Sequence, residues 1–120
     1  MAGIDVTLSD KYKVGPGTGD IRLSVTIGEG QSGTSRVKLN TQTLITASGP
    51  IGNLRVGKAK DVKGKTLSVR SVVNDVSALT NRMSVTYRLT GGPAPRVWTA
   101  RGKVVNEGDP LVFEATFSLE

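Results

Sequence analysis

Residues 82–119 read RMSVTYRLTGGPAPRVWTARGKVVNEGDPLVFEATFSL, and this stretch decides the fold. It holds three runs in which apolar and polar residues alternate, separated by Gly91–Pro95 and by Asn106–Pro110. Alternation with a period of two is typical of strands that bury one face, and clusters of glycine and proline mark the turns between them. The stretch therefore predicts a C-terminal meander of three antiparallel strands.

The two loops of this meander predict registers that agree with each other. A simple first hairpin puts Tyr87 opposite Trp98, and a simple second one puts Trp98 opposite Phe117. A slip of one residue in either hairpin would turn every side chain to the other face, so the agreement favours this arrangement. Trp98 is therefore predicted in the core, and Gly102 is predicted opposite Phe113, where a ring covers the bare glycine backbone.

The same alternation continues toward the N-terminus, where further strands are expected. The runs, some of them weaker, lie at Ile4–Ser9, Ile21–Ile27, Ser35–Leu39, Thr43–Ala47, Asn53–Lys58 and Thr66–Val72. The chain has 120 residues, which is too short for two independent cores. Residues 1–120 are therefore predicted to form one all-β domain, an antiparallel β-sandwich of seven or eight strands. An immunoglobulin-like topology is the first choice and a jelly roll the alternative, although the chain has no cysteine for the immunoglobulin disulfide.

One segment departs from the strand pattern. Val72, Val76 and Leu79 recur at spacings of four and three, and Asn74 is a suitable N-cap. This spacing predicts a short helical turn at Val73–Thr80, and we expect at most one such turn in the chain.

Composition removes most familiar catalytic chemistry. The chain has no cysteine and no histidine, so it has no thiolate nucleophile, no zinc ribbon and no imidazole base. Gly28–Gly33 matches the pattern GxGxxG, but a predicted strand follows it where a dinucleotide site needs a helix, which favours a hairpin loop. A serine with a lysine base, such as Ser68 with Lys65, is the remaining catalytic option. We expect a protein that is not an enzyme and holds no cofactor or metal.

The charged residues are unevenly distributed along the chain. The chain has a formal net charge of +6, and its basic residues concentrate at 55–70 and 82–101, whereas the charged residues after 101 are mostly acidic. If these basic segments share a surface, that surface would attract anionic polymers. The candidate polyanion-binding residues are Arg55, Lys58, Lys60, Lys63, Lys65, Arg70, Arg82, Arg88, Arg101 and Lys103.

Two functions fit these features. The first is a non-catalytic structural or protein-interaction module, with a protein partner or a second copy meeting its exposed sheet edges, as in a subunit of a larger assembly. The alternative is a module that binds nucleic acid or an anionic polysaccharide through the basic surface. The N-terminus lacks the pattern of a signal peptide or membrane span, which predicts a cytoplasmic protein, although a secreted domain without its leader would have the same sequence.

Overall fold

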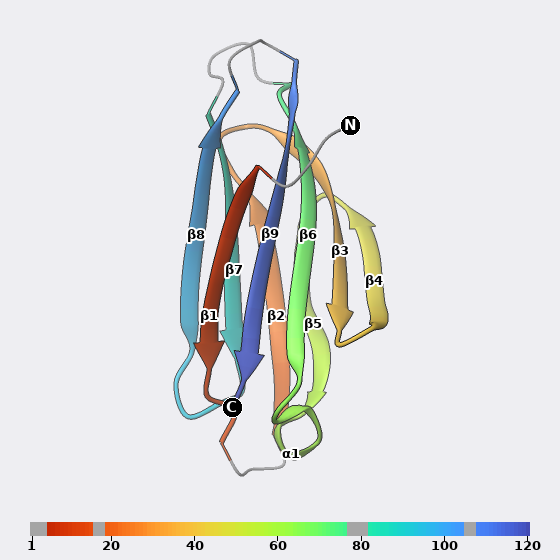
Figure 1. The fold of residues 1–120 in the computed structure, drawn as a ribbon, viewed down its shortest axis with the longest axis vertical. Coiled ribbons are helices and arrows are strands. Elements are labelled where there is room, and N and C mark those ends of the chain that lie inside the picture. Colours follow the sequence, from red (N-terminus) through yellow and green to blue (C-terminus); the bar gives the residue numbers. More distant parts are fainter. Residues whose placement is uncertain (1–4, 16–18, 77–81, 105–107) are drawn as a thin grey trace.

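The computed structural model describes residues 5–15, 19–76, 82–104 and 108–120, which form two packed β-sheets (Figure 1). The five-stranded sheet has the order β1-β9-β6-β3-β4, and the four-stranded sheet has the order β5-β2-β7-β8. This confirms the predicted all-β sandwich. The elements are β1 (Val6–Tyr12), β2 (Asp20–Ile27), β3 (Ser32–Leu39), β4 (Gln42–Ser48), β5 (Ile51–Lys58), α1 (Ala59–Val62), β6 (Thr66–Asn74), β7 (Arg82–Thr90), β8 (Arg96–Lys103) and β9 (Pro110–Leu119).

The strand pairing is antiparallel except at one edge. β1 runs parallel to β9, with Val6 beside Phe113 and Tyr12 beside Leu119. The nine strands exceed the predicted seven or eight, and the parallel pair departs from a purely antiparallel sandwich. The immunoglobulin-like topology stays a prediction.

The hairpin of β7 and β8 has the predicted register. Tyr87 pairs with Trp98 and Met83 with Gly102, and the hydroxyls of Thr86 and Thr99 lie 3.2 Å apart on the outer face. Trp98 is 9% exposed, so its predicted core position is confirmed. The alternating pattern therefore fixed both the pairing and the buried face of these two strands.

The predicted three-stranded meander is wrong, because β9 does not pair with β8. After β8 the chain crosses to the other sheet, where β9 lies between β1 and β6. Trp98 and Phe117 still meet, but across the sandwich, with ring centroids 4.6 Å apart. The ring of Phe113 also covers Gly102 from the opposite sheet. Alternation determines which side chains face inward, and either arrangement buries the same ones.

The helical turn was predicted in the wrong segment. Val73 and Asn74 belong to β6, and residues 77–80 lie outside the described residues. Val76 is 60% exposed, so the spacing that suggested a helix does not mark a buried face. The helix that the structure describes is α1, a single turn that buries Ala59 and Val62, and four residues are too few to show a helical period.

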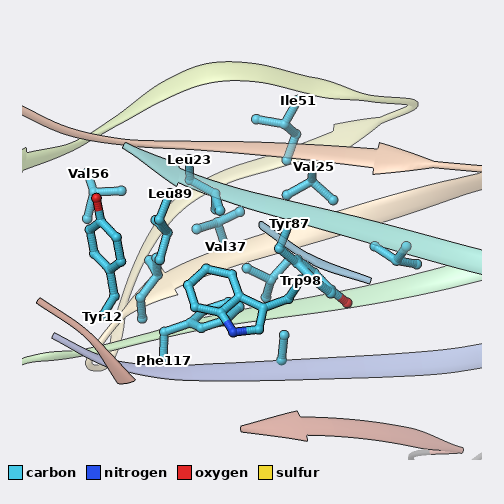
Figure 2. Packing of buried hydrophobic residues seen from close by; sticks show 14 of the residues in the cluster. Tyr12, Leu23, Val25, Val37, Ile51, Val56, Tyr87, Leu89, Trp98 and Phe117 are labelled. Carbon is cyan, nitrogen blue, oxygen red and sulfur yellow. The ribbon is translucent and has the colours of Figure 1, made fainter. Parts of the chain in front are cut away.

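The core fills the space between the inner faces of the two sheets (Figure 2). Around Phe117, Tyr87 lies at 5.8 Å and Trp98 at 4.6 Å between ring centroids. Such aromatic pairs contribute about 0.5–1.5 kcal/mol each beyond the area they bury. The Tyr87 hydroxyl is enclosed in this core, where burial raises its pKa and keeps it protonated.

The glycine-rich segment at residues 28–33 connects two different sheets. It leads from β2 in the four-stranded sheet to β3 in the five-stranded sheet, so the predicted hairpin loop is wrong. A strand follows it, as the sequence predicts, and not the helix of a dinucleotide site. Gly33 faces inward opposite Val73, and a Cβ at Gly33 would lie 2.7 Å from the carbonyl oxygen of Val72. The glycine permits the close approach of β3 to β6.

This close approach makes Gly33→Ala destabilising. The added methyl group meets backbone, which cannot move without separating the strands, so we expect a loss of about 1–3 kcal/mol in the free energy of unfolding. The control is Gly52→Ala, where a Cβ meets no atom within 4 Å. Urea unfolding of both variants measures the difference, and equal stabilities would contradict the packing described here.

Candidate interaction surfaces

The structure divides the ten predicted basic residues among three places. Arg70 alone projects from the outer face of the five-stranded sheet. The lysines 58, 60, 63 and 65 gather around α1 at one end of the sandwich (Figure 1). The remaining five project from the outer face of the four-stranded sheet, and they are Arg55, Arg82, Arg88, Arg101 and Lys103. The basic segment at residues 55–70 is therefore not one surface.

Four of these residues lie on the outer face of β7 and β8 and are called the basic face: Arg82, Arg101 and Lys103 near one end, and Arg88 further along, opposite Val97. Arg82 pairs with Lys103, and Ser84 pairs with Arg101. The two strands contain no aspartate or glutamate. Arg55 lies on the far edge strand, where its Nε is 3.0 Å from a carboxylate oxygen of Asp20, so its charge is partly compensated. The basic face is where the predicted positive charge is concentrated.

Sequence reasoning missed two cations beside Arg70. Arg36 on β3 lies directly opposite Arg70 on β6, and Lys38 lies opposite Ser68. The predicted set was chosen by counting charges along the chain, and the segment around residue 36 is not rich in charge. Alternation along β3 could have found both, since it places these side chains on one outer face.

That outer face also carries many hydroxyl groups. Together with the cations they form what we call the hydroxyl face of the five-stranded sheet. Its serine and threonine residues include Thr7, Ser9, Ser32, Thr34, Thr46, Ser48, Thr66, Ser68, Thr116 and Ser118. The two outer faces of the sandwich therefore differ, because arginine and lysine dominate the basic face and hydroxyl groups dominate this one.

A pocket of about 390 Å³ lies between the end of β1 and the loop from β7 to β8. Asp10 at its edge accepts hydrogen bonds from Trp98 Nε1 at 2.7 Å, the Lys11 amide at 2.8 Å and Arg96 Nη2 at 3.2 Å. The bond from Trp98, then the amide and the charge of Arg96, hold the pKa of Asp10 below its usual 3.8. The carboxylate oxygens of Asp10 thus accept hydrogen bonds from the protein itself. Because Asp10 is on β1 and both Trp98 and Arg96 are on β8, these bonds join the two sheets, and we call them the clamp.

A second polar cluster closes the opposite end of the sandwich. Gln31 Nε2 donates to Asp75 Oδ1 and to the Arg82 carbonyl oxygen, both at 3.0 Å. Gln31 Oε1 accepts from the Val76 amide at 2.8 Å, and the Gly108 amide donates to Asp75 Oδ2 at 3.0 Å. Both side chains are buried, and buried polar groups of this kind are stable because they are hydrogen-bonded. This cluster joins loops and strand ends.

The four edge strands differ in how they resist pairing with another chain. β8 carries Arg96, Arg101 and Lys103, and β1 carries Asp10 and Lys11. β5 carries two cations, and its register against β2 shifts twice, with Gly57 at φ 152°. β4, with the sequence QTLITAS, also has one register shift, against β3, but it is the edge strand without a charged side chain. Charges and irregularities protect edges from pairing, so β4 is the least protected edge.

The described residues contain neither a metal-binding cluster nor a helix able to span a membrane. No group of three or more aspartate, glutamate, histidine or cysteine residues there is arranged to hold a metal ion. None of the helices found in those residues has the length and apolar character needed to cross a membrane.

Comparison with protein-family models, with curated proteins and with solved structures gives no match to this chain. Its function must therefore be inferred from its own surfaces.

The clamp at Asp10 predicts a pH dependence of stability. Because its pKa is lower in the folded chain than in the unfolded chain, ionised Asp10 stabilises the fold above about pH 3.8, and this contribution disappears as the pH falls through the folded-state pKa. Asp10→Asn should therefore lower the melting temperature at pH 7, and this difference should shrink as the pH falls below 3.8. The fluorescence of Trp98, the single tryptophan, should titrate with a midpoint below 3.8.

The control for this experiment is Asp61→Asn, at an exposed position on α1. It should leave both the fluorescence titration and the melting temperature at pH 7 unchanged. A fluorescence titration that persists in Asp10→Asn would contradict the assignment to this carboxylate.

Proposed function

We propose that this chain is a non-catalytic structural β-sandwich that acts by binding protein, and that it does so by pairing β4 with a strand of another chain. The observation that carries the proposal is the uncharged edge of β4. An edge strand presents unpaired backbone N–H and C=O groups, and an added strand satisfies them by extending the sheet.

The composition of β4 supports strand addition. The strand contains Thr43, Ile45 and Thr46, residue types that favour extended backbone, and it has no proline. The other three edge strands carry charged side chains that oppose pairing. One edge is therefore better suited to a partner strand than the rest.

A second copy of the chain is the simplest partner. Antiparallel pairing of two β4 strands about a twofold axis would join two five-stranded sheets into one sheet. Each copy has a net charge of +6, so long-range repulsion opposes this approach, but the uncharged β4 adds no repulsion at the contact. Salt screens the long-range term, so self-association should strengthen as the salt concentration rises.

A charged substitution on β4 tests this proposal. Thr46→Lys should weaken self-association at least about tenfold, because two lysines would be brought together across the new strand pair. The matched control is Thr7→Lys, an equally exposed threonine on the same face but on the opposite edge of the same sheet. Light scattering after size exclusion, at low and physiological salt, measures the multimer. A monomer at high protein concentration in both salts would contradict pairing through β4.

The second candidate function is binding of an anionic polymer to the basic face. The observation that favours it is the clustering of Arg82, Arg88, Arg101 and Lys103 on two adjacent strands that contain no acid. A row of cations on one sheet face can neutralise several phosphate or sulfate groups at once and release their counterions. Binding of this kind weakens with salt, the opposite of the dependence expected for self-association.

Charge reversal on the basic face tests the second candidate. The double variant Arg88→Glu and Arg101→Glu should reduce the slope of log affinity against log salt by about two for heparin and for duplex DNA. The matched control, Lys60→Glu with Lys63→Glu, makes the same change in net charge near α1 and should weaken binding less. Equal losses in the two double variants would mean that net charge alone drives binding, and would exclude the basic face as a defined site.

A further inference from the structure

We infer that Arg36 and Arg70 together bind a divalent tetrahedral oxyanion, a phosphate or sulfate group, on the hydroxyl face. This site lies on the outer face of the five-stranded sheet, next to β4 and on the opposite sheet from the basic face. The inference starts from a comparison of two arginine pairs within the same fold.

The first arginine pair carries its own counterion. Arg22 on β2 and Arg55 on β5 are direct cross-strand partners on the outer face of the four-stranded sheet. Asp20 is shared between them, with one oxygen 3.0 Å from Arg55 Nε and the other 3.7 Å from Arg22 Nη2. Like charges directly opposite on a sheet repel each other, and here the carboxylate of Asp20 offsets that repulsion.

The second pair has no such carboxylate. Arg36 on β3 and Arg70 on β6 are also direct cross-strand partners. Glu114 pairs with Arg70 on the other side of β6. Even so, among the described residues no carboxylate oxygen lies within 4.0 Å of a side-chain nitrogen of either arginine, the distance that defines an ion pair. Arg36 and Arg70 thus lie opposite each other on adjacent strands without an ion pair like those that Asp20 makes in the first pair.

The surface around this pair is hollowed on both sides. One hollow, of about 310 Å³, is lined by Thr34, Arg36, Thr46, Arg70 and Val72. A smaller hollow, of about 110 Å³, is lined by Arg36, Lys38, Ser68, Arg70 and Glu114. Both arginines line both hollows, so an anion in either one meets two guanidinium groups. Threonine and serine hydroxyls at the rims supply further hydrogen-bond donors.

The net charge of the side chains around Arg36 and Arg70 favours a divalent anion. The two arginines and Lys38 bring three positive charges, and Glu114 brings one negative charge, which leaves two positive charges to compensate. A guanidinium group donates two parallel hydrogen bonds to a phosphate or sulfate, and two such groups can hold one tetrahedral anion from both sides. A single carboxylate would compensate only half of the excess charge. The ligand is therefore a phosphate or sulfate group, free or carried as a monoester.

Titration at constant ionic strength tests the site directly. The probes are inorganic phosphate, inorganic sulfate and O-phosphoserine, followed by amide chemical shifts in a ¹H–¹⁵N spectrum of the whole chain. We expect saturable shifts centred on Arg36 and Arg70, and a loss of affinity of about tenfold in Arg36→Gln and in Arg70→Gln. Arg36→Lys keeps the charge but loses the planar donor pair, so it should also weaken binding.

The control is Arg22→Gln, which removes the same charge from the arginine pair that Asp20 accompanies on the other sheet and should leave phosphate affinity unchanged. Tighter binding of O-phosphoserine than of phosphate would assign the group to a larger molecule, and the reverse order would assign a free ion. Either order supports the site. The absence of saturable shifts with all three probes, or shifts that survive both glutamine variants, would overturn it.

The melting temperature with and without phosphate gives a second test of the site. Substituting a surface arginine that binds no anion would not change how the melting temperature responds to phosphate. Without phosphate, Arg70→Gln should melt at a higher temperature than the unchanged chain, because the like-charge repulsion is removed. Adding phosphate should stabilise the unchanged chain, since the ligand binds the folded state, and should not stabilise the variant. A phosphate-dependent rise of equal size in both proteins would exclude the site without bearing on pairing through β4.

Discussion

The position of Trp98 fixes how the two sheets close on each other. Its ring packs 4.6 Å from the ring of Phe117 on β9, and its Nε1 donates to Asp10 on β1, so one side chain of the four-stranded sheet is held by two strands of the other. Arg96 adds to this contact by lying 4.8 Å over the indole ring and bonding the same carboxylate. Since β8 and β1 are edge strands, these contacts close one side of the sandwich (Figure 1).

Closure of that side determines which edges remain open to a partner. β1 and β8 are drawn together and carry charges, so an incoming strand meets both a crowded edge and exposed cations. On the far side, β5 is interrupted by register shifts, whereas β4 is uncharged. The contacts of Trp98 thus close one side of the sandwich, and the proposed pairing edge lies on the other.

Sequence patterns predicted the local part of this structure well and the long-range part poorly. Alternation placed Tyr87 opposite Trp98 correctly, because a hairpin with a short loop leaves few alternative registers. It could not assign β9 to a sheet, since β9 buries the same face whether it pairs with β8 or packs across from it. For the same reason alternation could not show that Glu114 pairs with Arg70 of β6. Counting charges along the chain also missed Arg36, whose importance depends on a strand more than thirty residues away.

The two proposed sites on the five-stranded sheet are physically coupled. Arg36 pairs with Arg70 on one side and with Thr46 of β4 on the other, so the uncompensated charge lies one strand from the proposed pairing edge. Joining two β4 strands would bring two such charged pairs toward each other across the new sheet, which raises the electrostatic cost of association. A divalent anion at each pair removes that charge and with it part of the cost. By linkage, the anion must then bind more tightly to the joined form than to the single chain.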